Sequence, residues 1–169
     1  MLESFAAWLG RTPLSAFVAG EAWVVPTIQT VHILAIAVVM GSVAILHLRV
    51  LGIVERRQSI GALAARFVPP SAAAIVVLAI TGFLMIASEP TRALFRYVFW
   101  VKMTLLLAAI ALTAVLLVGL KTADVFDDPA RPAPIPFRIL ALVVLLIWLA
   151  IIVTGRWIGY AEGWPGSPS

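Results

Sequence analysis

The sequence predicts an all-α integral membrane protein, an antiparallel four-helix bundle with a short N-terminal interfacial helix. Three observations point to this fold. Hydrophobic residues make up 63% of the 169 residues and charged residues only 12%, whereas about a quarter of an ordinary soluble domain is charged. Four apolar stretches are each long enough to cross a bilayer, which takes about 20 residues. The links between them are short, so consecutive helices are expected to run in opposite directions.

The first elements lie before the spans. Residues 2–10 are expected to form the interfacial helix, because their apolar side chains are interrupted by Glu3 and Ser4. Thr12 or Ser15 can cap a second short turn. The four predicted spans cover about residues 23–51, 67–88, 97–120 and 137–160. We expect all of these elements to form a single membrane domain over residues 1–169.

The charges indicate a membrane protein with both termini outside the cytoplasm. The net charge of +4 reflects arginines beside the membrane, and it is not evidence for a nucleic-acid partner. Basic residues near the first and third links outnumber those at the opposite ends, which places these links inside. Glu3, Arg11 and Pro13 argue against a cleaved signal peptide. The absence of cysteine excludes disulfides, thiolate metal sites and iron–sulfur clusters.

Both histidines of the chain, His32 and His47, lie in the first predicted span. The rise of a helix separates them by about 22 Å along its axis, one toward each side of the membrane. They are only about 60° apart around the helix, so both can face the bundle interior. Ionisable side chains at such depth are usually functional.

His32 is expected about two turns inside the outer boundary of the membrane. Four other side chains with suitable chemistry are expected at the same depth: Met85, Lys102, Met103 and Arg156. Imidazole ligates haem iron, a second His or Met can complete the axial pair, and cations offset the propionates. The constellation therefore predicts a haem b site with His32 as its most probable axial ligand.

His47 is expected in an inner layer with Arg49, Lys121 and Arg138, but without a methionine. It is the candidate ligand for a second haem at the opposite face. The other ligand of that haem would come from elsewhere, for example from a neighbouring subunit. We therefore expect a homo-oligomer in which haem lies at a subunit interface if one chain cannot supply every ligand.

Structural interpretations compete with these functional ones. A membrane histidine can bond a carbonyl or a serine across a helix interface, and this weighs equally with ligation for His47. Lys102 and Arg156 can extend to the outer surface. Met85 and Met103, taken singly, are more often packing residues.

Several short motifs follow one another along the chain: His32-Ile-Leu-Ala with Gly41 and Leu48-Arg49, then Pro69-Pro70 with Thr81-Gly82, then Trp100-Val-Lys102. Together they resemble a group of small bacterial four-helix proteins. That group includes the haem-containing membrane-type protoporphyrinogen oxidase and the membrane domain of copper-resistance protein D. The stretch from Leu48 to Gly52 also looks like the Leu-Arg-x-Leu-Gly ending of an uncharacterised bacterial family.

The resemblance implies a bacterial inner (cytoplasmic) membrane protein that binds haem. In the porphyrinogen oxidase group a histidine in the first span and a lysine in the third are functional, and they match His32 and Lys102. The oxidase-like proteins lack the long N-terminal segment, and their second histidine is spaced differently from His47. Haem binding therefore carries over better than any particular reaction.

The leading interpretation is a haem b membrane cytochrome that transfers electrons across or within the membrane. The protein would lie in the bilayer, and its partner would be a quinone or another redox partner. One alternative is a haem-free ion or proton transporter, or an accessory subunit, with Gln29, His32, Lys102 and Arg156 as an ion site. Another is a haem-dependent oxidoreductase acting on a porphyrinogen or quinol, which differs from the cytochrome by an added substrate pocket.

Overall fold

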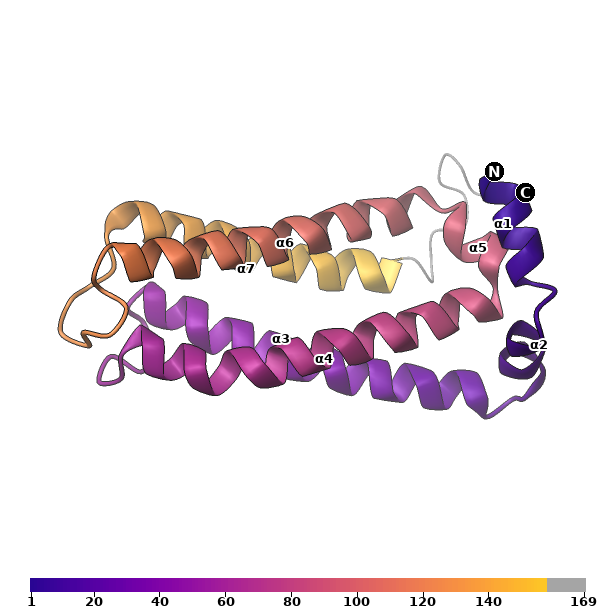
Figure 1. The fold of residues 1–169 in the computed structure, drawn as a ribbon, viewed down its shortest axis with the longest axis horizontal. Helices are drawn as coiled ribbons and strands as arrows, with labels where there is room; N and C mark the ends of the chain where they lie inside the picture. The colour runs from indigo at the N-terminus through magenta and orange to yellow at the C-terminus, as the bar shows by residue number, and fades with distance from the viewer. Residues whose placement is uncertain (158–169) are drawn as a thin grey trace.

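Four long helices dominate the protein (Figure 1). The computed structural model describes residues 1–157, which form seven helices and no strand. The long helices are α3 (Val24–Val50), α4 (Ile60–Ser88), α6 (Tyr97–Thr122) and α7 (Ile135–Trp157). Each is long and apolar enough to cross a bilayer. The predicted all-α fold is confirmed, and the chain is a multi-pass membrane protein.

The bundle consists of two helix pairs. α3 packs along α4, and α6 packs along α7, while the pairs meet mainly through α3 and α7. Within the described residues α4 and α6 do not pack closely against each other. The interior of the bundle is therefore covered least on the side between α4 and α6.

Three short helices gather at one end of the bundle, here called the terminal end (Figure 1). They are α1 (Leu2–Leu9), α2 (Pro13–Gly20) and α5 (Pro90–Leu94). α1 packs against α5, and α2 packs against α4 and α3. The Thr12 side chain caps α2, since its oxygen accepts a hydrogen bond from the backbone amide of Ser15 at 3.2 Å. The predicted N-terminal helix is therefore α1.

The second long helix begins at Ile60, before the predicted start of the span at residue 67. The Ser59 hydroxyl caps it by accepting a hydrogen bond from the amide of Ala62 at 3.1 Å. Pro69 and Pro70 lie inside the helix rather than at its start. Hydropathy locates the apolar stretch, but the cap decides where the helix begins. The last three residues of the predicted fourth span, 158–160, lie outside the described residues.

The opposite end, here called the link end, carries the connections formed by residues 51–59 and 123–134. Buried Arg49 ties these connections together, because its Nε donates to the Gln58 carbonyl at 2.8 Å and its Nη2 to the Pro129 carbonyl at 3.3 Å. Arg138 donates from Nη2 to the Leu51 carbonyl at 2.6 Å. These bonds satisfy link carbonyls that no helix pairs.

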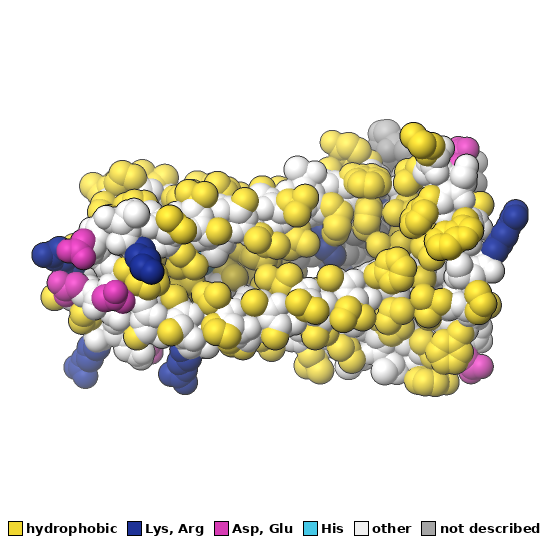
Figure 2. All heavy atoms as spheres, in the orientation of Figure 1, with side chains coloured by type: hydrophobic (Ala, Val, Ile, Leu, Met, Phe, Trp, Pro, Cys, Tyr) yellow, Lys and Arg dark blue, Asp and Glu magenta, His cyan; other side chains and the backbone are white. Residues whose placement is uncertain are grey.

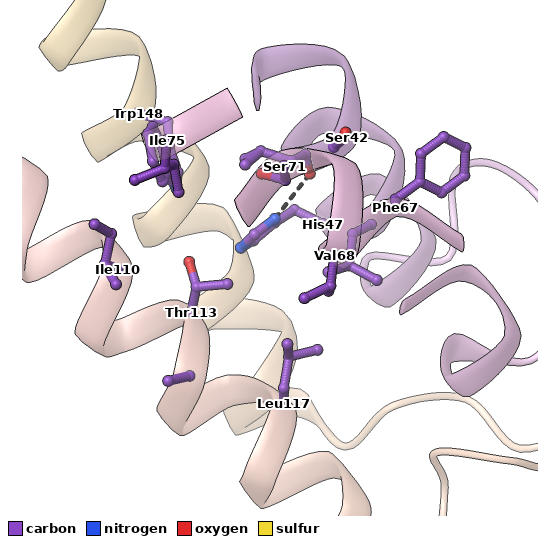
Figure 3. Close-up of a pocket in the computed structure, with 13 residues that line it drawn as sticks. Ser42, His47, Phe67, Val68, Ser71, Ile75, Ile110, Thr113, Leu117 and Trp148 are labelled. Atoms are coloured by element: carbon purple, nitrogen blue, oxygen red, sulfur yellow. Dashed lines mark hydrogen bonds between the residues drawn. The ribbon is translucent and has the colours of Figure 1, made fainter. Parts of the chain in front are cut away.

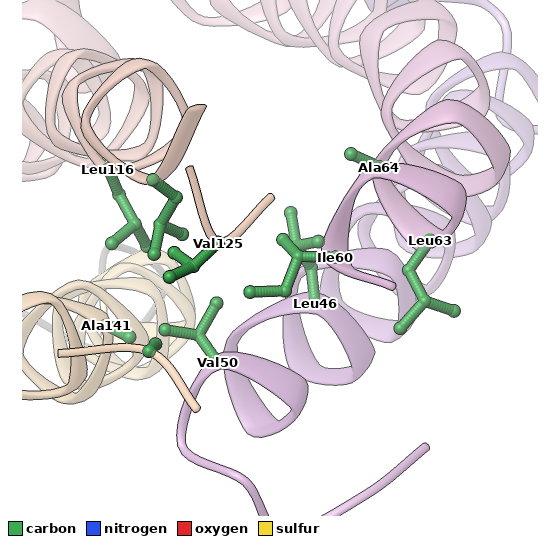
Figure 4. Close-up of a cluster of buried hydrophobic side chains, with 10 residues drawn as sticks. Leu46, Val50, Ile60, Leu63, Ala64, Leu116, Val125 and Ala141 are labelled. Atoms are coloured by element: carbon green, nitrogen blue, oxygen red, sulfur yellow. The ribbon is translucent and has the colours of Figure 1, made fainter. Parts of the chain in front are cut away.

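Below these arginines an apolar cluster joins all four long helices (Figure 4). It includes Leu46 and Val50 of α3, Ile60 of α4 and Leu116 of α6, and none of these side chains is more than 3% exposed. Val125 of the second connection closes it. The link end is thus a dry, densely packed part of the molecule.

The sides of the bundle are apolar, and the charges lie mostly toward its ends (Figure 2). Large side chains such as Ile33, Leu107, Val118 and Ile139 are each more than half exposed. A soluble monomer rarely exposes contiguous apolar surface of this extent. The lipid bilayer covers this surface.

Candidate functional site

His32 is half-buried on α3, in the half of the bundle nearer the terminal end. Its Nδ1 lies 2.7 Å from Oγ1 of Thr81 on the neighbouring helix α4. The ring also lies beside Gly82, where an added Cβ would be 3.7 Å from the imidazole Cε1. A hydroxyl and a glycine of α4 thus fix the position of the ring.

The hydroxyl of Thr81 determines which nitrogen of His32 carries the proton. Its Oγ1 also lies 2.7 Å from the Val77 carbonyl, which can only accept. The single hydroxyl proton is therefore donated to Val77, and Oγ1 accepts from Nδ1–H of His32. Nε2 is then unprotonated, with its lone pair directed away from Thr81. An imidazole held by Nδ1–H with a free Nε2 is the usual form of a metal-ligating histidine.

Lys102 is the cation that the structure brings to this histidine. The side chain extends from α6 across Gly155 of α7, where an added Cβ would be 3.3 Å from the Lys102 Nζ. The ammonium is close enough for its charge to act on the His32 ring. In Figure 2 the surface is hollowed between α4 and α6 in this half, with a Lys or Arg side chain at the floor of the hollow.

The other three predicted members of this layer are Met85, Met103 and Arg156. Met85 and Met103 are half-buried, and within residues 1–157 neither sulfur forms a hydrogen bond with an imidazole. Arg156 follows Gly155 on α7 and is exposed. Of the predicted members of this layer, Lys102 is the one whose charge acts on His32.

His47 has different surroundings. It is fully buried, and its Nδ1 lies 2.8 Å from the carbonyl of Val43, one turn earlier on the same helix. A carbonyl only accepts, so Nδ1 carries the proton and Nε2 is the unprotonated nitrogen. Nε2 is buried and has no hydrogen-bond partner among the described residues. Leaving a buried acceptor without a partner costs about 1–3 kcal/mol.

A cavity of about 200 Å³ lies beside His47 (Figure 3). The imidazole extends from α3 toward Thr113 of α6, with Nε2 at its tip. Trp148 of α7 also lines the cavity, and its indole Nε1 is a second buried nitrogen without a partner among the described residues. The remaining lining is largely apolar: Ser42, Val43, Leu46, Phe67, Val68, Ser71, Ile75, Ile110, Thr113, Ala114 and Leu117.

The cations predicted near His47 do not line this cavity. Arg49 and Arg138 donate to the carbonyls of the link end, as described above. Lys121 is exposed at the end of α6. No charged side chain is among the residues that line the cavity.

Two features of these sites were not anticipated from the sequence. The sequence pointed to Thr81 only as part of the Thr81-Gly82 motif, and no role was predicted for Trp148. In an antiparallel pair, moving along one helix means moving back along its partner. Residues 32 and 81 are in contact near one end of the α3–α4 pair, and residues 47 and 67 line the same cavity near the other. That register would have identified Thr81 as a partner of His32.

The residues described contain no group of three or more His, Asp, Glu or Cys side chains able to hold a metal ion. A site built from one imidazole therefore suits a cofactor that brings its own ligands, as a porphyrin does, better than a bare cation.

Comparison with known proteins gives a family but no activity. No curated protein and no solved structure matches the chain. A family model matches residues 4–161, which is nearly the whole sequence. The chain therefore belongs to this family, a family of unknown function (DUF6644).

Proposed function

We propose that the protein is a haem b-binding membrane cytochrome with His32 as an axial ligand. The observation that supports this most is the hydrogen bond of 2.7 Å between His32 Nδ1 and Thr81 Oγ1. It holds the ring and directs an unprotonated Nε2 away from Thr81, as a ligand to iron requires. Haem, when bound, supplies one-electron redox chemistry, so the proposed activity is electron transfer within the membrane.

The charges near His32 support the same proposal. A haem carries two propionates, which are stabilised by nearby cations. Lys102 is close to His32, and Arg156 lies next to the glycine that Lys102 crosses. We propose that these two side chains hold the propionates. The resemblance of His32 and Lys102 to the functional residues of the membrane-type porphyrinogen oxidase group is a further, weaker support.

The proposal is limited to one haem per chain. The cavity beside His47 measures about 200 Å³, below the roughly 300–1,000 Å³ of pockets that enclose drug-sized ligands. Four linked pyrrole rings do not fit such a space. In the other half of the bundle the surface is hollowed between α4 and α6 (Figure 2), and we propose that the haem of His32 lies there. Met85, Met103 or a second copy of the chain would complete the axial pair.

The test is the haem content of the purified full-length protein. Cells supplied with a haem precursor would produce the wild type, His32→Ala and the control Gln29→Ala, which changes an exposed residue one turn earlier. We expect about one haem per chain in the wild type and in Gln29→Ala by the pyridine haemochrome assay, and almost none in His32→Ala. Full haem content in a folded His32→Ala protein would refute the proposal.

A further inference from the structure

Two of the residues that line the cavity beside His47 each have a buried nitrogen atom without a hydrogen-bond partner among the described residues. Nε2 of His47 is an acceptor, and Nε1–H of Trp148 is a donor. The two side chains are 0% and 4% exposed. Buried polar atoms normally have a partner, and an exception calls for a missing one. An occupant that donates to His47 and accepts from Trp148 would satisfy both.

The size and polarity of the cavity restrict that occupant. An engineered apolar cavity of about 150 Å³ takes up one benzene molecule, so about 200 Å³ has room for one substituted ring. The lining has no charged side chain, which disfavours phosphate head groups and carboxylates. Water is the competing occupant, because the hydroxyls of Ser42, Ser71 and Thr113 also line the cavity and can serve as its polar partners.

The cavity also has a route to the bilayer. Three of the side chains that line it, Val68 of α4 and Ile110 and Ala114 of α6, are exposed on the lipid-facing surface. They lie on the two helices that do not pack closely together. A ligand could therefore place its ring in the cavity while an apolar tail leaves between α4 and α6.

We propose that this cavity binds the head group of a membrane quinol, with one hydroxyl donating to His47 Nε2 and the other oxygen accepting from Trp148 Nε1–H. A quinone has carbonyl oxygens only, so it would bond Trp148 and offer nothing to Nε2. The site therefore selects the reduced form. The inference goes beyond the proposed haem site and does not depend on it, since the cavity lies on the other histidine.

The experiment measures binding of decylubiquinol and decylubiquinone to the full-length protein in lipid nanodiscs, with empty nanodiscs as background. Bound ligand is extracted and quantified, the quinol samples being kept anaerobic with reductant. We expect saturable binding near one per chain, with the quinol bound roughly five- to tenfold more tightly. A short-chain menaquinol is tested in parallel, and saturable binding of either quinol supports the site.

Five variants locate the site. His47→Leu should abolish the preference for quinol and leave quinone binding nearly unchanged, and Trp148→Phe should weaken both forms roughly fivefold. Ala114→Phe, which blocks the mouth between α4 and α6, should abolish binding without removing a polar atom. Gln29→Ala, at an exposed residue, is the control and should bind quinol like the wild type. His32→Ala, which lacks the proposed haem ligand, tests whether the two sites are separate.

Several outcomes would overturn the inference. No saturable binding above empty nanodiscs would mean that lipid chains or water fill the cavity. Equal binding in Ala114→Phe, folded as judged by helical circular dichroism, would place the ligand elsewhere. Loss of quinol binding in His32→Ala would put the quinol at the haem site. Loss of haem alone in that variant would leave this inference intact, so the two proposals fail separately.

Discussion

His32 and His47 are both histidines of helix α3, but their surroundings differ. In both, Nδ1 carries the proton and Nε2 is the nitrogen left for a ligand. The Nδ1 of His32 is held by a hydroxyl of another helix, whereas that of His47 is held by a carbonyl of its own helix. His32 is half-buried near a lysine, and His47 is fully buried beside an uncharged cavity.

This difference is the basis for proposing two separate binding sites along one helix. A cross-helix bond to Thr81 fixes the imidazole relative to both α3 and α4, which suits a ligand that must keep one geometry. A bond within α3 fixes the ring relative to its own helix only. The nearby cation favours an anionic cofactor at His32, and the uncharged lining favours a neutral ligand at His47. The proposed haem and quinol sites follow from this contrast.

The largest expected effect is a complete separation of the two ligands between the two histidines. His32→Ala should lose haem and retain quinol, while His47→Leu should retain haem and lose its preference for quinol over quinone. Haem content and quinol binding are measured on the same preparations. If either substitution removed both ligands from a folded protein, the contrast drawn here would be wrong.

The next largest effect concerns the partner of His32. Thr81→Val keeps the shape of the side chain but removes the acceptor for Nδ1–H, so the ring loses its orientation. Changes to such partners typically cost 10- to 100-fold in metal affinity, and we expect haem affinity to fall by about that factor. Haem titration of the protein purified without haem measures it.

Thr113→Val is the matched control for that variant. The hydroxyl of Thr113 donates to the Ala109 carbonyl of its own helix at 2.7 Å, and the side chain lines the cavity of His47. Its loss should leave haem affinity within about twofold of the wild type. Equal losses in the two variants would indicate a general effect of removing a threonine hydroxyl.

A smaller effect is expected from the glycine beside His32. A Cβ at position 82 would lie 3.7 Å from the imidazole, an ordinary contact, so Gly82→Ala should bind haem nearly as the wild type does. Gly82→Leu should displace the ring and weaken haem binding about tenfold, a loss of about 1.4 kcal/mol. The same titration compares the two, and a Gly82→Leu protein with unchanged affinity would show that the ring does not need its present position.

The smallest effect should appear in the reduction potential. A positive charge near iron favours the reduced state, so replacing Lys102 by methionine should lower the midpoint potential. We expect a fall of roughly 30–60 mV, about 0.7–1.4 kcal/mol for a one-electron couple. Lys121→Met, at the link end, is the control and should not shift the potential. A rise in potential for Lys102→Met would contradict the proposed role of the lysine.

Most of the fold follows from the sequence, because lipid allows few alternatives. Hydropathy and length identify the four spans, and short links impose the antiparallel order. The start of α4 at Ile60 did not follow, because Arg66 and the Pro69–Pro70 pair interrupt the apolar pattern while the Ser59 cap lies before them. The pairing of α3 with α4 and of α6 with α7 is a matter of packing that hydropathy does not contain.

The candidate sites were predicted less completely. The approximate depth of each residue in the membrane is readable from the sequence, and the grouping of Lys102 with His32 rests on it. Depth does not say which way a side chain points, so Thr81 was not predicted as the partner of His32. For the same reason Arg49 and Arg138 were grouped with His47, although their side chains donate to carbonyls of the link end. The cavity beside His47 depends on gaps among four helices and has no signature in one chain.

The most direct test of the haem proposal is the visible spectrum of the purified wild-type protein, recorded oxidised and then reduced with dithionite. A haem b cytochrome should show a sharp α band on reduction, with about one haem per chain. A well-folded protein that remains colourless after growth with haem precursor would contradict the proposal. His32 and Lys102 would then be better explained as an ion or proton site.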